Sequence, residues 1–361
     1  MRRLIVLVTG SSGTSYGDIV RALKSSKRYR IDVVGSDCRE SLSSKHYVKR
    51  NYLLPDNRNP EFANALLDLC VRQKIDIVLP TQTGDQLPIC ERLGDFRDAN
   101  VEPALIVTDP FLLDVILNKR KMLEYCKEII RIETPSYSYA DTSEGLRRAV
   151  QRLGHPEIPV VVKPSFADGG RGTRILNERV DARRRFLSEK PDSTFSSLNR
   201  VLNTIGDSFP EMLVMEYLPG KEYMLDTLCR KGKTFAVIPE IVTRNAEGVT
   251  TGGVVSKDDN FDSLVRVAES VIEGFGLSYS VIVHLKENAS GKPSVLGIHP
   301  GLQDTTVISI AAGVNIPELM VMMACREFDY AYSPRIAWGL KMQRVWREVF
   351  EYGGKIWTSD K

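Results

Sequence analysis

Short apolar runs recur along the first hundred residues, and segments with helical apolar spacing separate them. Residues 4–8, 31–34, 75–79 and 104–107 are rich in β-branched and aliphatic side chains and are predicted strands. Residues 18–23 are a predicted helix, and a second apolar stripe at helical spacing consists of Phe62, Leu66, Leu67, Cys70 and Val71. Strands that alternate with helices predict a small parallel, doubly wound α/β sheet.

The later part of the chain repeats both patterns. Residues 146–153 and 195–205 have helical spacing, while residues 280–285 and 294–298 are two strands that bracket a hairpin turn. We also expect a C-terminal helix from about Trp338 to Tyr352. Its core-facing residues would be Leu340, Val345, Val349 and Phe350.

A glycine-rich loop follows a buried strand in the stretch 158–176, IPVVVKPSFADGGRGTRIL. The strand ends at Lys163, the loop contains Gly169, Gly170 and Gly172, and a second strand begins near Thr173. Such a hairpin can bring backbone N–H groups close to an anion, and the lysine adds a positive charge, so the pattern favours a polyphosphate ligand. It is not a Walker A loop, because no GK[ST] follows the glycines. The alternative is a flexible hairpin beside an unrelated lysine.

A second motif, MLVMEYLPGKEYMLD at residues 212–226, has a strand, a Pro-Gly turn and another strand. With these residues the chain resembles the ATP-grasp superfamily, in the branch of the carbamoyl-phosphate synthetase large subunit, from the first strand to about residue 345. The resemblance implies one ATP-grasp unit with an α/β fold. Its expected domains are a Rossmann-like pre-ATP-grasp domain at 1–115, linker helices and a small lid lobe at 116–215, and a large catalytic lobe with the C-terminal helix at 216–361.

The resemblance also implies a nucleotide site for ATP. Lys119 and Lys163 would contact phosphates, and the loop with Gly169, Gly170 and Gly172 would cover them. The backbone of Glu216, Tyr217 and Leu218 would contact adenine, and Glu222 would accept from the ribose hydroxyls, for which a carboxylate is a suitable acceptor. For Lys119 the alternative is an ordinary solvated lysine at a helix end.

The hairpin at residues 280–298 departs from the family pattern. Family members hold Mg²⁺ there with acidic and amide side chains, and an arginine stabilises an acyl-phosphate intermediate. In this chain His284 replaces a glutamine, Gly297 a glutamate, His299 an asparagine and Gly301 the arginine. Mg²⁺ prefers hard oxygen ligands, so the magnesium that the resemblance implies has lost its expected ligands.

Two interpretations of the replaced residues remain open. His284 and His299, assisted by Asp304, could bind Zn²⁺ in place of magnesium, or the histidines could reflect drift after the metal site lost its role. Arg244 and Lys257 are candidate catalytic cations, and the alternative is that both are ordinary surface residues.

The N-terminal segment offers a rival nucleotide site. Gly10, Gly13 and Gly17, with Asp37 about twenty residues later, imitate a dinucleotide-binding fingerprint, but the glycine spacing does not fit it. Residues 80–87, PTQTGDQL, resemble a substrate-pocket segment of the ATP-grasp family in which Gln86 replaces the usual glutamate. The alternative is a strand-end loop capped by Asp85.

Composition limits the remaining classes. The 361 residues carry a net charge of +3 with acids and bases interspersed, which gives no electrostatic footprint for nucleic acid. Six scattered cysteines without a CxxC pair indicate reduced thiols and a cytoplasmic protein. No apolar run reaches membrane-spanning length.

Two classes of function follow. The first is an ATP-dependent carboxylate–amine ligase that works through an acyl phosphate on small-molecule substrates. The second is a catalytically degenerate relative that binds nucleotide or a partner protein without magnesium-dependent turnover. The acceptor substrate and the oligomeric state are not indicated by the sequence, although ATP-grasp proteins often form homodimers.

Overall fold

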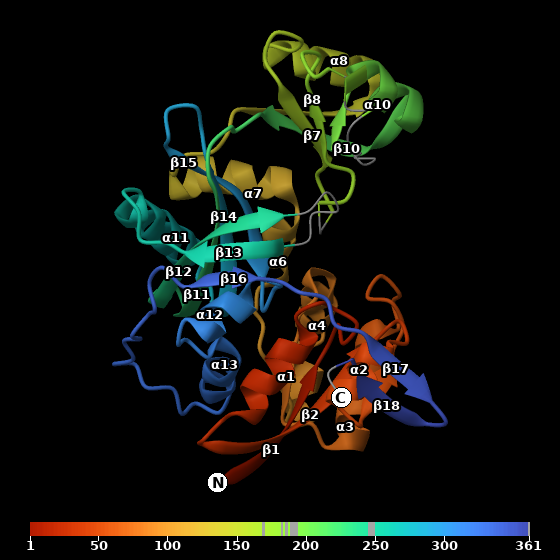
Figure 1. Cartoon of the computed structure of the whole chain (residues 1–361), viewed down its shortest axis with the longest axis vertical. Helices are drawn as coiled ribbons and strands as arrows, with labels where there is room; N and C mark the ends of the chain where they lie inside the picture. The colour runs from red at the N-terminus through yellow and green to blue at the C-terminus, as the bar shows by residue number, and fades with distance from the viewer. Residues whose placement is uncertain (168–169, 182, 185–186, 188–193, 245–249, 360–361) are drawn as a thin grey trace.

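The chain forms three lobes, each built on its own sheet, and a small C-terminal hairpin (Figure 1). The structure is a computed structural model that describes residues 1–361 except 168–169, 182, 185–186, 188–193, 245–249 and 360–361. We call the lobes N-terminal, small and large, after the first, second and third sheets. The mixed α/β architecture expected from the alternation of strands and helices is confirmed.

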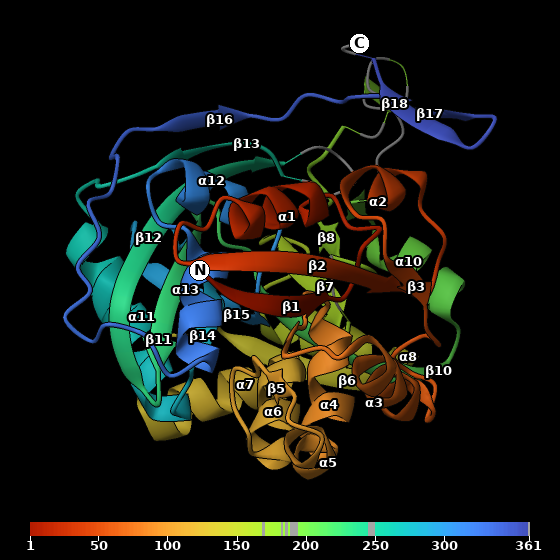
Figure 2. The same cartoon turned by 90° about the horizontal axis from the view of Figure 1, so that it is seen from below.

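The N-terminal lobe is a parallel five-stranded sheet in the order β3-β2-β1-β4-β5. Figure 2 shows α1 and α2 on one side of this sheet and α3 to α5 on the other, which is the doubly wound arrangement. The strands are β1 (Arg2–Val8), β2 (Tyr29–Asp37), β3 (Asn51–Leu53), β4 (Ile77–Leu79) and β5 (Glu102–Pro103). The helices are α1 (Tyr16–Lys24), α2 (Leu42–Tyr47), α3 (Phe62–Gln73), the 3₁₀ turn η1 (Thr83–Asp85), α4 (Gln86–Glu91) and α5 (Leu93–Asp98).

Two helices and a π-helical turn lead to the small lobe. They are α6 (Pro110–Leu117), α7 (Lys119–Tyr125) and η2 (Cys126–Ile130). The small lobe has the strand order β6-β10-β7-β8-β9, in which β7 and β8 form the predicted antiparallel hairpin. Its elements are β6 (Tyr137–Thr142), α8 (Ser143–Arg152), β7 (Val160–Pro164), β8 (Arg174–Leu176), β9 (Phe195–Ser196), α10 (Leu198–Ile205) and β10 (Ser208–Glu216).

The large lobe is an antiparallel six-stranded sheet in the order β15-β14-β11-β12-β13-β16. Its apolar faces are covered by helices such as α11, whose Leu264, Ala268, Val271 and Ile272 form one buried stripe. The elements are β11 (Glu222–Arg230), β12 (Lys233–Arg244), β13 (Thr250–Val255), α11 (Phe261–Phe275), β14 (Tyr279–Glu287), β15 (Pro293–Pro300), α12 (Thr306–Ala311), α13 (Ile316–Ala324) and β16 (Lys341–Gln343).

The prediction of a C-terminal helix from about Trp338 to Tyr352 is wrong. Lys341–Gln343 pairs with the edge strand β13, and the chain then forms the hairpin β17 (Val349–Tyr352) and β18 (Lys355–Thr358). The turn consists of Gly353 and Gly354, whose φ angles of 58° and 74° suit a two-residue hairpin turn. The apolar residues Leu340, Val345, Val349 and Phe350 misled the prediction, because they do not form one buried stripe and Val345 is 80% exposed.

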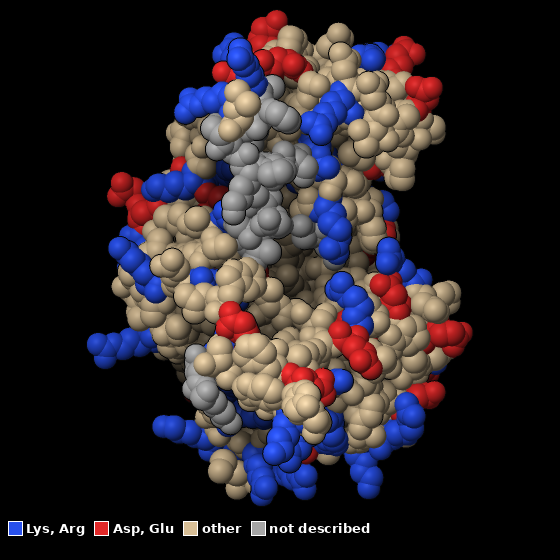
Figure 3. Space-filling model, turned by 45° about the vertical axis from the view of Figure 1, so that its right-hand side comes forward, with Lys and Arg blue, Asp and Glu red and all other residues tan. Residues whose placement is uncertain are grey.

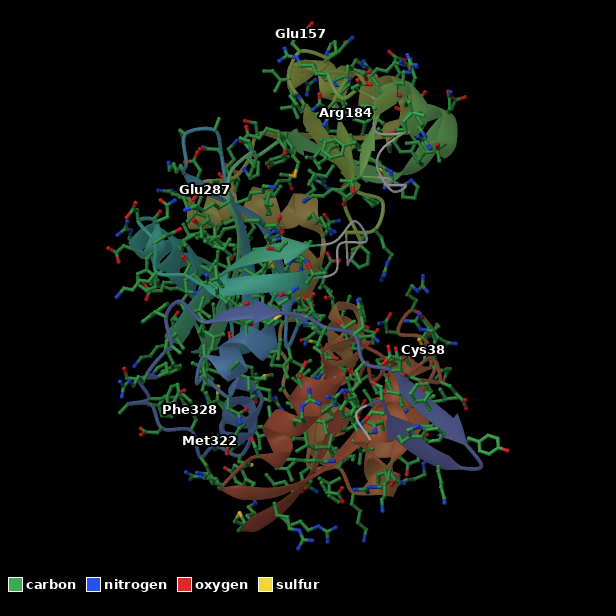
Figure 4. All side chains as sticks on the ribbon, in the orientation of Figure 1. Cys38, Glu157, Arg184, Glu287, Met322 and Phe328 are labelled. Atoms are coloured by element: carbon green, nitrogen blue, oxygen red, sulfur yellow. The ribbon has the colours of Figure 1, made fainter. Side chains whose placement is uncertain are left out.

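The N-terminal and large lobes are held together by shared packing. One buried cluster combines β1 and α1 with the large-lobe helices α12 and α13, and a second joins α3 to α7 with α11, β11 and β14. At the edge of the first interface, Glu327 accepts hydrogen bonds from Tyr29 at 2.8 Å and from Arg2 at 2.9 Å. Figure 4 shows Met322 and Phe328 beside this interface. The domain limits at residues 115 and 215 stay a prediction.

Candidate functional site

Two lysines meet where the linking helices reach the small lobe. Asn118 caps α7 by accepting from the N–H groups of Arg120 and Lys121, which places Lys119 at the first helical position. The Lys119 N–H donates to the carbonyl of Ser165 at 2.8 Å, and its ammonium donates to the carbonyl of Ala167. Lys163 lies near the end of β7, and burial together with the charge of Lys119 lowers the pKa of Lys163 to about 7. Both predicted phosphate lysines therefore lie at the root of the glycine loop.

The glycine loop itself is described only in part, because Gly169 lies outside the described residues. Gly170 and Gly172 both have left-handed backbone conformations, with φ of 72° and 75°. A β-carbon at Gly172 would also lie 2.7 Å from the Pro164 ring, so this position requires glycine. The Thr173 N–H donates to the Gly170 carbonyl at 3.1 Å, which closes the turn into β8.

The predicted adenine-binding segment connects the small and large lobes. The Glu216 N–H donates to Ser136 at 2.9 Å, Leu218 is buried, and the Tyr217 ring lies 5.7 Å from the Lys286 ammonium. The following turn is fixed by Glu287, which accepts from the Lys221 N–H at 3.1 Å. Figure 4 shows Glu287 at the end of the large-lobe sheet that faces the small lobe.

Glu222, the predicted ribose acceptor, is surrounded by nitrogen donors at the start of β11. Its carboxylate lies 3.1 Å from Nε of Arg244, 3.1 Å from Nε2 of His284 and 3.9 Å from Nζ of Lys286. Burial alone would raise the pKa of Glu222, but the hydrogen bond with His284 and the charges of Arg244 and Lys286 hold it well below its usual range. The carboxylate is therefore ionised, and His284 donates to it through Nε2–H.

The strand register supports the comparison of the β14–β15 hairpin with the magnesium hairpin of the ATP-grasp family. His284 pairs with Gly297 across the two strands, and His299 follows two residues later on the same face of β15. The ring centroids of His284 and His299 are 5.7 Å apart. A β-carbon at Gly297 would lie 3.2 Å from Nε2 of His299, so the His299 imidazole fills the space that a side chain at position 297 would enter.

Gly301 adopts a conformation that excludes the arginine found at this position in the family. Its φ is 73°, and a β-carbon there would lie 2.7 Å from the carbonyl oxygen of Pro80 in the N-terminal lobe. The Gly301 N–H donates to Ser280 at 3.0 Å, which fixes this turn on β14. A side chain at position 301 would therefore require a shift of this turn or of the Pro80 carbonyl.

These residues do not fit a magnesium site. Positions 297 and 301 offer no oxygen ligand, and burial lowers the pKa of His299 to about 3, so its imidazole is neutral. The zinc interpretation also lacks support, because the described residues contain no group of three histidine, cysteine or carboxylate side chains that could hold a metal ion. Asp304, its expected third ligand, instead accepts from the Thr250 N–H at 3.2 Å.

The basic side chains converge on the position where family members hold metal. Besides burial and His284, the charges of Lys119, Arg244 and Lys163 all lower the pKa of His299. The two candidate catalytic cations, Arg244 and Lys257, therefore lie in different parts of the large lobe. Arg244 belongs to this group, whereas the Lys257 ammonium lies over the ring of Phe261, 5.2 Å from its centroid, near the opposite end of β13.

Sequence reasoning missed a buried acidic pair on the same face of the large-lobe sheet. Asp226 and Glu240 are both fully buried, and Oγ of Ser309 lies 2.8 Å from Asp226 and 2.9 Å from Glu240. Burial raises the pKa of Asp226 to about 7 and that of Glu240 well above its usual value. A single hydroxyl proton cannot serve two carboxylates, so at least one of them carries a proton. Only Asp226 stood in a motif, and no signal in the sequence pairs it with Glu240.

The rival features of the N-terminal lobe have structural explanations. Asp37 accepts from the N–H groups of Ser12 at 2.8 Å and Arg39 at 3.1 Å, so its carboxylate stabilises its own turn. A β-carbon at Gly17 would lie 2.3 Å from the Tyr47 ring, which accounts for that glycine by packing.

The segment at residues 80–87 is partly buried, with Pro80, Asp85 and Gln86 shielded from solvent. Asp85 does not cap α4; it accepts from Asn57 at 2.9 Å, and burial raises the pKa of Asp85 to about 6. Gln86 is buried and accepts from the Ile106 N–H at 3.3 Å.

The surface adds two observations. Figure 3 shows Lys and Arg side chains interspersed with Asp and Glu over this face, as expected from the charge pattern of the sequence. None of the helices in the described ranges combines the length and the apolarity that crossing a bilayer requires.

Comparisons with known proteins agree with the fold. Residues 208–347 match the family model "ATP-grasp in the biosynthetic pathway with Ter operon". The chain is similar to the N5-carboxyaminoimidazole synthetase of Staphylococcus aureus, solved in complex with ADP. That similarity has a TM-score of 0.69 and 14% sequence identity, and it covers 96% of this chain and 83% of the other.

Two curated relatives share parts of the sequence. The formate-dependent phosphoribosylglycinamide formyltransferase of Haloquadratum walsbyi is 25% identical over 178 residues, which are 49% of this chain and 40% of the relative. The carbamoyl phosphate synthase large chain of Campylobacter jejuni is 19% identical over 314 residues, which are 82% of this chain and 26% of the relative. The chain thus spans less than half the length of either relative.

Proposed function

We propose that this chain, which carries an ATP-grasp domain of the carboxylate–amine ligase type, binds an adenine nucleotide between its small and large lobes. The observation that supports this most directly is the group formed by Lys119, Lys163 and the glycine loop. Two basic side chains and a glycine-rich loop suit phosphates, and an ionised Glu222 at the other end of the site suits the ribose hydroxyls. The segment with Glu216, Tyr217 and Leu218 is the proposed adenine contact.

Binding is tested by isothermal titration calorimetry of the full chain with ADP. We expect saturable heat for the unaltered protein and at least a tenfold weaker affinity for Lys163→Met, which removes a charge-assisted contact of roughly 1.5–3 kcal/mol. Lys233→Met is the matched control, because Lys233 is exposed at the far end of β12 from Arg244. Equal affinities of Lys163→Met and Lys233→Met for ADP would show that Lys163 does not contact the nucleotide.

The proposed reaction is the joining of a small carboxylate to an amine. A carboxylate oxygen would attack the γ-phosphorus of ATP, so that ADP leaves and an acyl phosphate forms. The amine would then attack the acyl carbon, and phosphate and a proton would leave. The test measures ADP release over a panel of carboxylates and amines. Release that needs both substrates would support this reaction.

A second candidate is a degenerate relative that binds nucleotide, or a partner protein, without magnesium-dependent turnover. The observation that favours it is the β14–β15 hairpin, where Gly297, His299 and Gly301 replace the groups that neutralise the transferring phosphate in the family. ADP binding without ADP release from ATP on any substrate pair would favour this candidate over the ligase.

A further inference from the structure

In the β14–β15 hairpin, the imidazole of His299 occupies the space where family members have a magnesium ligand. His299 lies against Gly297, with Nε2 only 3.2 Å from the position of a β-carbon there. His284 is already engaged, because its Nε2–H donates to Glu222 at 3.1 Å. Two neutral imidazoles, those of His284 and His299, thus lie at the expected metal position. One of them, His284, is hydrogen-bonded to Glu222, the proposed ribose acceptor.

Positive side chains surround the same position. The charges of Lys119, Lys163 and Arg244 all act on the His299 imidazole. Arg244 and Lys286 of the large-lobe sheet also reach Glu222. Within the described part of the chain, Glu222 is the carboxylate in direct contact with this group, and it faces both Arg244 and Lys286. The described residues therefore place several basic side chains around one carboxylate, an arrangement that favours an anionic ligand.

A cation group of this size can replace the ions that usually accompany a nucleotide. Two Mg²⁺ ions neutralise the phosphates in a working ATP-grasp site, and ammonium and guanidinium groups can supply the same charge through hydrogen bonds. A divalent ion added here would meet several basic side chains and no oxygen ligand from positions 297 or 301. Coulomb repulsion would therefore oppose its binding.

We propose that this site binds a nucleoside di- or triphosphate without a divalent cation, and that Lys119, Lys163 and Arg244 neutralise the phosphates. This inference rests on the proposed nucleotide site and adds to it the ionic form of the ligand. The ligand is the free polyphosphate, whereas magnesium-dependent relatives take the metal complex.

The first test is titration of the full chain with ADP in EDTA and in excess Mg²⁺. We expect dissociation constants in EDTA no more than about threefold weaker than in Mg²⁺. An affinity more than tenfold tighter with Mg²⁺ would overturn the inference while leaving the nucleotide site intact. Absence of heat under both conditions would remove the proposed nucleotide site itself, so the two failures are distinguishable.

The second test attempts to create magnesium dependence. The double variant Gly297→Glu, His299→Asn supplies an oxygen ligand and removes the ring that fills its space. We expect it to bind ADP at least tenfold more tightly with Mg²⁺ than with EDTA. His299→Asn alone is the matched control and is expected to stay indifferent to Mg²⁺, because it adds no carboxylate. Magnesium dependence in that control, or in the unaltered protein, would contradict the inference.

The double variant does not include Gly301→Arg, although family members have an arginine at this position. Gly301 has a φ of 73° and faces the Pro80 carbonyl, so Gly301→Arg would disturb the interface between the N-terminal and large lobes. Circular dichroism and thermal unfolding identify any variant that does not fold. If the double variant does not fold, the comparison of EDTA with Mg²⁺ on the unaltered protein still decides the question.

Discussion

Nucleotide binding is expected to consume a proton at Lys163. The pKa of this lysine lies near 7 in the empty site because burial and Lys119 oppose its charge. A bound polyphosphate favours the charged form and would return the pKa to the ordinary range of a lysine. The empty site therefore holds the neutral amine above pH 7 and must bind a proton when the phosphate arrives, so affinity falls as pH rises.

The size of the effect follows from the two pKa values. Between pH 6.5 and pH 8.5 the charged fraction of a group with a pKa near 7 falls by roughly 25-fold, while the bound form stays charged. The corresponding loss of binding free energy is about 1.9 kcal/mol. Lys163 is only half-buried, so this value is an upper figure for the measured change. His299, with a pKa of about 3, stays neutral over this range.

The assay is calorimetry with ADP at both pH values, in buffers of different ionisation enthalpy, which report the number of protons bound. Lys163→Arg is the control, because a guanidinium stays charged over this range. The ionisation of ADP itself and of distant groups contributes equally to both proteins. We expect proton uptake close to one at pH 8.5 for the unaltered protein and close to zero for the variant. The same pH dependence in both would refute the role assigned to Lys163.

Two further predictions concern stability. Asp226→Asn should stabilise the protein at pH 8 by up to about 4 kcal/mol in urea unfolding, because the native carboxyl, with its pKa raised to about 7, contributes stability below pH 4 that is lost as pH rises through 7. A stabilisation of the same size at pH 4 would contradict this cause. Gly301→Ala should destabilise the fold by more than about 1 kcal/mol, whereas Gly297→Ala, with only a flexible imidazole nearby, should cost less. A larger loss of stability for Gly297→Ala than for Gly301→Ala would show that the backbone near Pro80 adjusts at a lower cost than the His299 imidazole.

Local patterns in the sequence predicted most of the fold, including the strands that carry the proposed nucleotide site. The strand ending at Lys163 and the segment around Glu222 are continuous motifs, and each contains its own evidence for a strand, a turn and a charged residue. The β14–β15 hairpin was predicted for the same reason, and its register pairs His284 with Gly297. Apolar spacing could not predict that Lys341–Gln343 adds to the edge of β13, because strand pairing depends on a partner far away in the chain.

The roles of individual charges were harder to predict. Arg244 and Lys257 had equal standing in the sequence, and only the strand pairing of β12 and β13 places one beside Glu222 and the other at aromatic rings. The pair of Asp226 and Glu240 was missed because two separate strands and α12 bring it together. The free energy of burying two carboxyl groups depends on neighbours that are distant in the sequence, and local sequence patterns do not show these neighbours.

The placement of the C-terminal hairpin affects the order in which the N-terminal lobe can be built during synthesis. Strands β17 and β18 lie beside α2 of the N-terminal lobe, although a long stretch of chain separates them from it (Figure 1). The lobe therefore depends on a contact between residues that are translated early and residues that are translated much later. Until residues 349–358 have been synthesised, the surface around Tyr47 lacks the hairpin that later covers it, and a nascent chain would expose this surface to chaperones.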